Sequence, residues 1–338
     1  VLAQSTTEKR NLRASSGGLI KELIHHLLAQ DDIDGVLALD EAQGLDYHVR
    51  LITHPDEIDQ LPGSIYHAVP LDGTLRLLEE NKGRFVIVGI PCQLEGVYNY
   101  IFNQAPELAE RIAFTIGLLC GWLYSHHAVE AISKFKKIDA SAITQISYRG
   151  GGPIGKLQIS TEEKTTRIGR RVDFGYQVAF DRSFNAPRCH LCINHANFLA
   201  DLVVGDAWLP STVTTRTGVS MVTCRTPEAS DLIDALSESG AIVVAEATVD
   251  ELTESQTHRV TFGDFAYAYA DHLDEIGIFR PKMVGPNREL TDLSSPAEAS
   301  AFHKELTRKR KLQKERRYRF LWWRKATREL PRHLRRYF

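Results

Sequence analysis

The sequence predicts an α/β fold with α+β elements: a mostly parallel central sheet with helices, an inserted hairpin region and a C-terminal basic helix. Two apolar runs, Phe85–Ile90 and Ile112–Leu119, are rich in β-branched residues, which is typical of strands buried on both faces. Each run is followed by a turn and a helical stretch, beginning near Leu94 and Ser125. Repeated strand–turn–helix units indicate a parallel sheet.

The remaining elements follow from their periodicity. Apolar residues recur at helical spacing over Leu19–Gln30, and Gly35–Asp40 is a short apolar run expected to form a strand. The stretches ITQISYR (from Ile143) and KLQIS alternate apolar and polar residues around a Gly150-Gly151-Gly152-Pro153 turn, which predicts a hairpin. We further expect strands at 202–204, 219–225 and 241–245, helices at 227–239, 250–258 and 264–275, and a loop at 188–197.

The expected organisation is one folded domain followed by a tail. Of the 338 residues, 43% are hydrophobic, which is enough for a sizeable core. We expect a domain over residues 1–280, with an N-terminal part to about 140 and a C-terminal part from about 141. A linker at 281–300 and a basic helical tail at 301–338 complete the chain.

Composition excludes several classes of protein. No run approaches 18 apolar residues, and the first residues lack the apolar core of a secretory signal. The chain does not begin with Met, which leaves a trimmed N-terminus open. Five cysteines are too few for a disulfide scaffold, so we expect a reducing, cytoplasmic location in which clustered cysteines indicate metal or redox chemistry.

Charge is distributed unevenly along the chain. Residues 303–338 hold 15 Lys+Arg and 3 Asp+Glu, whereas the rest holds 26 and 40. A basic helix carrying Phe320, Trp322 and Trp323 can lie on an anionic membrane surface, which predicts peripheral association at the inner membrane face. An acidic partner, nonspecific contact with nucleic acid and a solvated terminus are the alternatives; no specific nucleic-acid site is expected.

Four of the cysteines form a candidate metal site. Cys92 and Cys120 each follow a predicted parallel strand, and ligands gather at the carboxyl ends of such strands. Cys189 and Cys192 add a CxxC pair on a loop. Four thiolates suit a [4Fe–4S] cluster or zinc, and the two single cysteines favour the cluster. A zinc site with His195, a dithiol couple and simple burial of the thiols stay open.

Three loops offer groups for an anionic or aromatic cofactor. Ser15-Ser16-Gly17-Gly18 precedes a helix, where free N–H groups bind anions, although an ordinary N-cap is the alternative. Gly63-Ser64-Ile65-Tyr66-His67 supplies hydroxyl, aromatic and imidazole groups. Gly205, Asp206 and Trp208 follow the strand at 202–204, where Asp206 is either a site residue or a helix cap. Three arginines near the hairpin can meet a phosphate or an acidic substrate: Arg149, Arg170 and Arg171.

Several motifs, in order, resemble the coenzyme F420 hydrogenase/dehydrogenase beta-subunit family of iron–sulfur flavoproteins. The resemblance extends from about Ser5 to Thr226. It rests on Ala14-Ser15-Ser16-Gly17-Gly18, Gly63-Ser64-Ile65-Tyr66, Gly89-Ile90-Pro91-Cys92-Gln93-Leu94-Glu95-Gly96, Gly117-Leu118-Leu119-Cys120, Arg188-Cys189-His190-Leu191-Cys192, Ala200-Asp201-Leu202, Gly205-Asp206-Ala207-Trp208, Gly218-Val219 and Arg225-Thr226.

The resemblance implies two cofactors. Members of this family bind FAD and at least one [4Fe–4S] cluster, and Cys92, Cys120, Cys189 and Cys192 fall on positions similar to the cluster ligands. It also favours flavin contacts from the three loops: Ser15, Ser16, Gly17, Gly18, Ser64, Tyr66, Gly205, Asp206 and Trp208. Many relatives carry an eight-cysteine ferredoxin segment that this sequence lacks, which predicts a single cluster and an external electron carrier.

The expected function is therefore that of an iron–sulfur flavoprotein oxidoreductase. It would pass electrons between the cluster, FAD and a hydride donor or acceptor, such as coenzyme F420 or a specialised substrate, for example in a polysaccharide pathway. Expected partners are an electron-donor protein (ferredoxin or a partner subunit) and a hydride carrier or small-molecule substrate. The alternatives are a non-catalytic electron-transfer or scaffold subunit and a zinc-stabilised binding protein. No catalytic acid or base is assigned.

Overall fold

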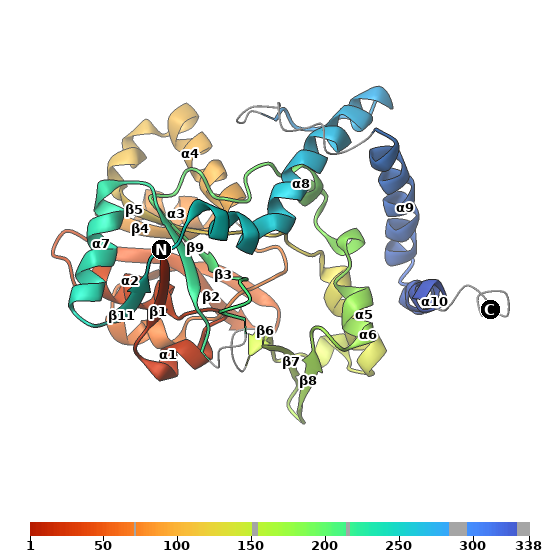
Figure 1. The fold of residues 1–338 in the computed structure, drawn as a ribbon, viewed down its shortest axis with the longest axis horizontal. Helices are drawn as coiled ribbons and strands as arrows, with labels where there is room; N and C mark the ends of the chain where they lie inside the picture. The colour runs from red at the N-terminus through yellow and green to blue at the C-terminus, as the bar shows by residue number, and fades with distance from the viewer. Residues whose placement is uncertain (71, 151–154, 214–216, 284–295, 330–338) are drawn as a thin grey trace.

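The computed structural model describes residues 1–70, 72–150, 155–213, 217–283 and 296–329 (Figure 1). Within these ranges, eight strands form a large sheet in the order β11-β1-β10-β9-β5-β4-β2-β3. The four central strands, β9, β5, β4 and β2, run parallel, and the flanking strands pair antiparallel. Their bounds are β1 Leu2–Ser5, β2 Gly35–Gln43, β3 Asp46–Ile52, β4 Phe85–Gly89, β5 Ile112–Leu118, β9 Leu202–Asp206, β10 Ser220–Cys224 and β11 Ile242–Ala245. The predicted α/β class is confirmed.

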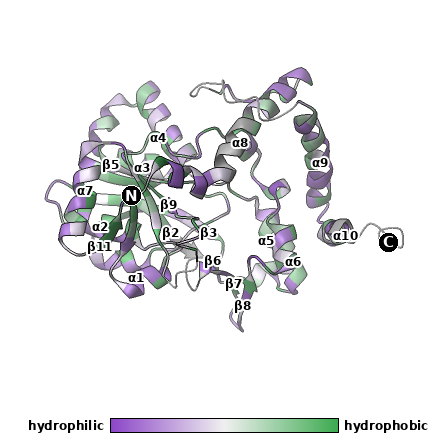
Figure 2. Ribbon diagram, viewed as in Figure 1, coloured by the Kyte–Doolittle hydropathy of each residue, from purple (hydrophilic) through white to green (hydrophobic). Residues whose placement is uncertain are grey.

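Helices cover both faces of this sheet, and side chains alternate between the two faces. Val86 and Ile116 pack against α2 and α7, whereas Phe85 and Ile87 pack against α3 and α4. This explains why β4 and β5, in the middle of the sheet, consist almost entirely of apolar and small residues. Figure 2 shows hydrophobic residues concentrated in this part of the sheet. The helices are α1 Glu8–Arg13, α2 Leu19–Leu27, α3 Asp72–Glu80, α4 Pro91–Gln104 and α7 Pro227–Glu238, with short 3-10 helices η1 Pro55–Gln60 and η2 Pro106–Arg111.

A smaller antiparallel sheet lies beside the large one. Its strands are β6 Gln145–Gly150, β7 Lys156–Ser160 and β8 Thr165–Gly169. Pairing of β6 with β7 confirms the predicted hairpin, whose turn residues 151–153 lie outside the described ranges, and β8 adds a third strand. The apolar side of this sheet packs against α5 (His126–Lys136) and α6 (Phe174–Ala179), with η3 (Ala140–Ala142), η4 (Arg182–Phe184) and η5 (Pro187–Leu191) in the connections.

Three helices end the described chain and differ from the expected ones. α8 is continuous over Val249–Glu275, where we expected two helices, because a single glycine is tolerated inside a helix. The basic tail forms two helices, α9 (Pro296–Lys314) and α10 (Tyr318–Glu329), because Arg316 adopts a left-handed φ of +52° between them. In the described ranges, the helices all fall short of the length and apolar character that crossing a bilayer requires.

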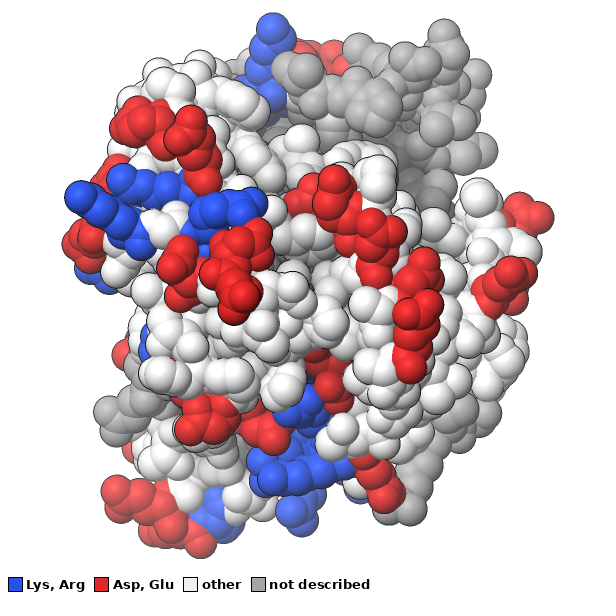
Figure 3. Space-filling view, turned by 90° about the vertical axis from the view of Figure 1, so that its left-hand side faces the viewer, with Lys and Arg blue, Asp and Glu red and all other residues white. Residues whose placement is uncertain are grey.

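The described part of the tail, residues 301–329, packs onto the body. Leu312, Tyr318 and Leu321 are buried in the cluster that also contains α5 and α6. The opposite side of the molecule carries charges of both signs. Figure 3 shows Asp and Glu side chains scattered over that face, with smaller groups of Lys and Arg between them.

Candidate functional site

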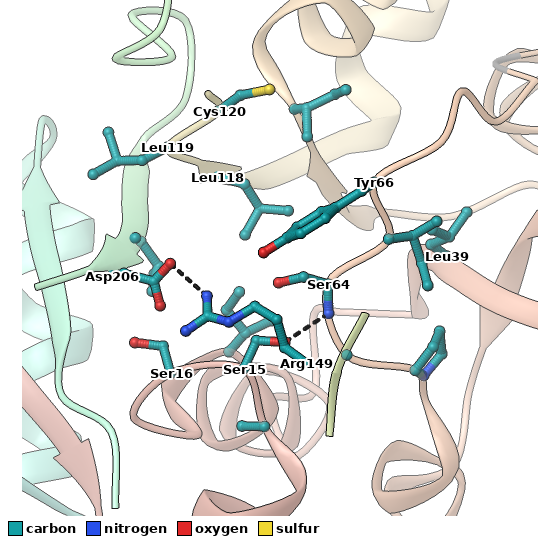
Figure 4. Close-up of a pocket in the computed structure, with 18 of the residues that line it drawn as sticks. Ser15, Ser16, Leu39, Ser64, Tyr66, Leu118, Leu119, Cys120, Arg149 and Asp206 are labelled. Atoms are coloured by element: carbon teal, nitrogen blue, oxygen red, sulfur yellow. Dashed lines mark hydrogen bonds and ion pairs between the residues drawn. The ribbon is translucent and has the colours of Figure 1, made fainter. Parts of the chain in front are cut away.

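A cavity of about 640 Å³ opens at the carboxyl ends of the central strands. Its walls come from the ends of β2, β4, β5 and β9, from the N-terminus of α2, and from loops that approach from the smaller sheet (Figure 4). This volume is within the range of small-molecule and cofactor sites. The position is the one where parallel α/β sheets bind ligands.

The N-terminus of α2 faces the cavity without a side-chain cap. Gly18 holds the N-cap position at φ +73°, where a side chain would be strained, and no side-chain oxygen of the described residues caps the helix. Ser15, Ser16 and Gly18 line the cavity. Gly17 instead packs closely against β1, since a Cβ on this residue would sit 2.7 Å from the carbonyl oxygen of Ala3. The ordinary N-cap considered for this stretch is therefore not observed, and the first N–H groups of α2 are available to an anion.

Hydrogen bonds fix this loop from two sides. The Ser15 hydroxyl accepts from the backbone N–H of Ser64 at 2.9 Å, which brings two of the predicted loops together (Figure 4). The Ser16 hydroxyl donates to the carbonyl oxygen of Val219 at 2.9 Å, and the N–H of Gly17 donates to the Ser220 hydroxyl at 3.1 Å. The conformation of the Ser15–Gly18 loop thus depends on residues more than 200 positions away in the sequence.

Tyr66 lies in the cavity wall among polar and aromatic groups. Its hydroxyl accepts from the Arg170 guanidinium at 3.2 Å, and that guanidinium lies 5.4 Å from the Tyr66 ring centre. The centre of the Tyr148 ring is 5.0 Å from that of the Tyr66 ring. Burial raises the pKa of Tyr66, so its hydroxyl stays protonated and can donate or accept a hydrogen bond.

Asp206 and Arg149 form an ion pair between the two sheets. The distance from Arg149 Nη1 to Asp206 Oδ2 is 2.6 Å, with side chains 2% and 19% exposed (Figure 4). The guanidinium also lies 5.2 Å from the Trp208 ring centre. Asp206 does not cap a helix, since it ends β9. Gly205 leaves room for the Leu119 side chain, because a Cβ at residue 205 would lie 2.6 Å from Cβ of Leu119.

The charged lining favours an anion. Among the described residues, the cavity lining contains one carboxylate, that of Asp206, and four basic side chains, those of Lys21, Arg149, Arg170 and Arg171. Burial lowers the pKa of Lys21 to about 8, and its ammonium donates to two backbone carbonyls, those of Asp59 and Leu61. A cavity with this excess of positive charge attracts negatively charged ligands.

The four candidate metal-binding cysteines are thiols, and each is partly exposed. Cys92 lies in the first turn of α4, Cys120 follows β5, and Cys189 and Cys192 flank the end of η5. Electrostatic interactions between thiols link Cys92, Cys189 and Cys192, which places these three near one another. Burial raises the pKa of all three, that of Cys192 to about 11, so the apo protein holds them as neutral thiols.

Cys120 is joined to the CxxC loop through the backbone. Its N–H donates to the carbonyl oxygen of His195 at 3.1 Å, and Nδ1 of His195 donates to the Cys120 carbonyl oxygen at 2.8 Å. The N–H of Leu123 donates to the sulfur of Cys189 at 3.3 Å. Cys120 also lines the cavity, and Figure 4 places its sulfur at the rim.

In the described ranges, no three His, Cys, Asp or Glu side chains converge as a preformed metal site, and this holds for the four cysteines as well as for the CxxC pair with His195. The donor set suits a four-thiolate group in number and chemistry, because all four residues are cysteine thiols and the N–H of Leu123 already points at one sulfur. Metal binding would deprotonate these thiols.

His67 also lines the cavity, on the same loop as Tyr66. His67 is buried, with Nδ1 2.6 Å from the Tyr148 hydroxyl and Nε2 2.9 Å from the Leu45 carbonyl oxygen. Because a carbonyl only accepts, Nε2 carries the proton and Nδ1 accepts from the tyrosine. Burial lowers the pKa of His67 to about 4. In the sequence, only the position of His67 next to Tyr66 indicates a site residue. Its hydrogen-bond partners, Tyr148 and Leu45, are distant from it in the sequence.

Fold and site together define an α/β protein with an anion-attracting cavity bordered by cysteine-bearing loops. The family model described as "Coenzyme F420 hydrogenase/dehydrogenase, beta subunit N-term" matches residues 1–76, and its C-terminus counterpart matches residues 82–250. The chain belongs to this coenzyme F420 hydrogenase/dehydrogenase beta-subunit family. The family resemblance inferred from the motifs is confirmed, and with it membership of a family of F420-linked oxidoreductase subunits.

Individual relatives are distant. One subunit of the F(420)H(2) dehydrogenase of Methanosarcina mazei is 23% identical over 204 residues, covering 60% of this chain and 55% of that protein. Coenzyme F420 hydrogenase subunit beta of Methanosarcina barkeri is 23% identical over 228 residues, covering 65% of this chain and 75% of the relative. The beta subunit of an F420-dependent formate dehydrogenase of Methanocaldococcus jannaschii is 26% identical over 208 residues, covering 61% and 52%. The match thus spans about half the length of two of these relatives.

The fold is shared with a solved structure. A chain of the F420-reducing [NiFe] hydrogenase complex from Methanosarcina barkeri superimposes with a TM-score of 0.63 at 18% identity. The superposition covers 83% of this chain and 94% of that one.

Proposed function

We propose that this chain is an F420-type oxidoreductase subunit that binds a flavin in the cavity and one [4Fe–4S] cluster at Cys92, Cys120, Cys189 and Cys192. The observation that carries the proposal is that Cys120 belongs to the wall of the same cavity that Ser15, Ser64, Tyr66 and Asp206 line. A flavin accepts a hydride and releases electrons singly, so its proximity to a one-electron cluster is what such an enzyme requires.

The chain's own residues would supply position and charge. The N–H groups that open α2, together with Arg149 and Arg170, suit the phosphates of FAD or an acidic hydride carrier. Tyr66 and Trp208 offer aromatic surface on the same cavity. Tyr66 remains protonated because its pKa is raised by burial, so it can orient a polar ligand atom without changing charge.

The test is anaerobic purification followed by visible spectroscopy and analysis of iron, sulfide and flavin. We expect flavin bands, a broad shoulder near ~400 nm that dithionite bleaches, and about four irons per chain, as one cluster requires. Reduced F420, a reduced nicotinamide and reduced ferredoxin are then offered separately to the oxidised protein. Bleaching by one of them identifies the hydride or electron partner. A colourless, zinc-containing protein would contradict the proposal and favour the zinc-stabilised binding protein.

A second candidate is a non-catalytic electron-transfer or scaffold subunit within a larger complex. The observation that favours it is that the named relatives are subunits of multisubunit hydrogenases or dehydrogenases. Steady-state turnover with each donor and an artificial acceptor separates the two functions. A protein whose flavin is reduced without turnover on its own, but which turns over with a partner subunit, would favour the relay.

For location, we propose a cytoplasmic protein that can associate with the inner membrane face through α10. Phe320 and Trp323 stack on the outer side of this helix at 5.9 Å and are 39% and 42% exposed, with the Arg317 guanidinium 5.3 Å from the Phe320 ring centre. Exposed aromatics among arginines are typical of interfacial anchors.

Co-sedimentation with vesicles tests the association. The full chain should pellet with phosphatidylserine-containing vesicles and not with neutral ones, and a Phe320→Ser/Trp323→Ser variant should stay in solution. Equal pelleting of the variant and the parent chain would refute the membrane assignment.

A further inference from the structure

The CxxC loop is covered on its outer side by the C-terminal helices. His190, between the two cysteines, is 4% exposed. Its ring lies 5.1 Å from that of Phe302 on α9 and 6.3 Å from that of Tyr269 on α8. The middle of the Cys189-His190-Leu191-Cys192 stretch is therefore fixed by side chains that come about 80 and 110 residues later in the sequence.

The segment before the loop is held by the same helix. Lys309 on α9 forms an ion pair with Asp181 at 2.7 Å, and Gln313 donates to the carbonyl oxygen of Ser183 at 3.1 Å. Arg310 donates to the carbonyl oxygen of Asn185 at 3.3 Å. Three successive contacts along α9 thus follow residues 181–185, which lead directly into Pro187–Cys192.

A cation–π contact connects the two halves of this arrangement. The Arg182 guanidinium lies 4.9 Å from the ring centre of Phe302 and 5.1 Å from that of Phe265 on α8. Phe302 therefore touches both Arg182 and His190, one on each side of η5's start. Its loss would release the loop at two points.

The inner side of the same segment rests on the loop that follows Cys120. The N–H of Ala186 donates to the Leu123 carbonyl oxygen at 2.7 Å, and the N–H of Ser125 donates to the Phe184 carbonyl oxygen at 2.8 Å. Residues 181–192 otherwise form only the short 3-10 helices η4 and η5, which have little stability of their own. Their conformation depends on being held between these two surfaces.

We propose that α9 is a clamp that positions the CxxC loop for its metal, with Phe302 and Lys309 as positioning residues. The positioning of the loop follows from the contacts of α9. The effect on the metal rests on the proposed function, in which Cys189 and Cys192 bind a cluster. Without the clamp, Cys189 and Cys192 sample conformations in which they do not face Cys92. The C-terminal helices, distant from the cavity in sequence, thereby determine how long the cluster is retained.

The test compares the full-length protein with Phe302→Ala, Lys309→Met and the control Phe279→Ala. Phe279 is 95% exposed and lies between α8 and α9, so the control makes the same substitution without touching the loop. Two quantities are measured: amide hydrogen exchange of peptides covering 181–195 in metal-free protein, and the rate of iron release to a chelator from protein as purified anaerobically.

In Phe302→Ala, exchange in 181–195 and iron release should each become about tenfold faster or more, because removing a packed aromatic ring destabilises its surroundings and opens them more often. Lys309→Met should show a smaller acceleration, about two- to fivefold, as expected for a partly exposed ion pair. The control should match the parent in both. If Phe302→Ala does not fold, Lys309→Met decides by the same criteria.

Unchanged exchange in a folded Phe302→Ala protein would overturn the clamp, whatever its metal content. Faster exchange with unchanged iron release would overturn the link between clamp and cluster. A parent protein that contains no iron would contradict the proposed function, and the exchange measurement would still decide whether α9 holds the loop.

Discussion

Replacing Asp206 by Asn should destabilise the protein substantially, because it leaves a buried guanidinium without its carboxylate. The Arg149 side chain is 2% exposed and only 2.6 Å from Asp206, so the energetics of this ion pair are close to those of a fully buried pair. Breaking a buried pair from one side costs about 3–5 kcal/mol. Since Asp206 is 19% exposed at the cavity, water screens part of the charge, and we expect about 3 kcal/mol.

That loss converts into a measurable shift of the unfolding midpoint. The entropy of unfolding of a chain of 338 residues is about 0.7 kcal/mol/K near the midpoint, so about 3 kcal/mol lowers the midpoint by about 4 °C. Differential scanning fluorimetry or calorimetry on Asp206→Asn, Arg149→Met and the double variant measures it. The double variant should be less destabilised than the sum of the single ones, by about 1–2 kcal/mol.

Two results would contradict this reasoning. A midpoint for Asp206→Asn within about 1 °C of the parent would mean that the guanidinium is solvated at little cost. Additive effects in the double variant would mean that the two side chains do not act as a pair, whatever their distance in the structure.

Further predictions concern the cluster, the cavity and pH. Cys92→Ala should lose the iron measured in the purified protein while Cys224→Ala keeps it, and retention in both would remove Cys92 from the proposed ligands. Gly205→Ala should lower the bound flavin and cost about 1–3 kcal/mol, because the new Cβ would lie 2.6 Å from Cβ of Leu119; a flavin titration and a urea unfolding curve check both effects. Because burial lowers the pKa of His67 to about 4, folding favours its neutral form; the stability it contributes is present above about pH 6.5 and is lost as the pH falls toward 4. The free energy of unfolding, measured with urea at pH 7 and pH 4.5, should therefore fall less in His67→Asn than in the parent, by up to about 3 kcal/mol. An equal fall in both proteins would show that His67 does not cause this loss of stability.

The central strands could be predicted because their signal is local. Phe85–Ile90 and Ile112–Leu119 contain only apolar and small residues around a threonine, and no other element explains such runs. Their carboxyl ends then placed Cys92 and Cys120 at one edge. β1 carried no comparable signal, because Leu2–Ser5 is four residues long and gains its identity by pairing with β10 and β11.

The candidate site was predictable as a set of loops and not as a set of contacts. Asp206 and Arg149 were each considered, yet nothing in the sequence indicates that a residue of the smaller sheet reaches the end of β9. The docking of the tail was likewise hidden. Phe302 lies in a strongly polar helix, and only the folded structure shows that its ring meets His190.

The position of β1 has a consequence for how the protein is made. β1 pairs with β10 and β11, so Leu2 lies opposite Met221 and Ala245. During synthesis the first strand leaves the ribosome long before its two neighbours exist, and contacts between distant residues form slowly. The Ser16–Gly17 wall is bonded to Val219 and Ser220, so the cavity is closed only after residue 220 has emerged. If the proposed function holds, the flavin is therefore loaded late in synthesis, and a chain cut short before β10 would lack a complete cavity for it.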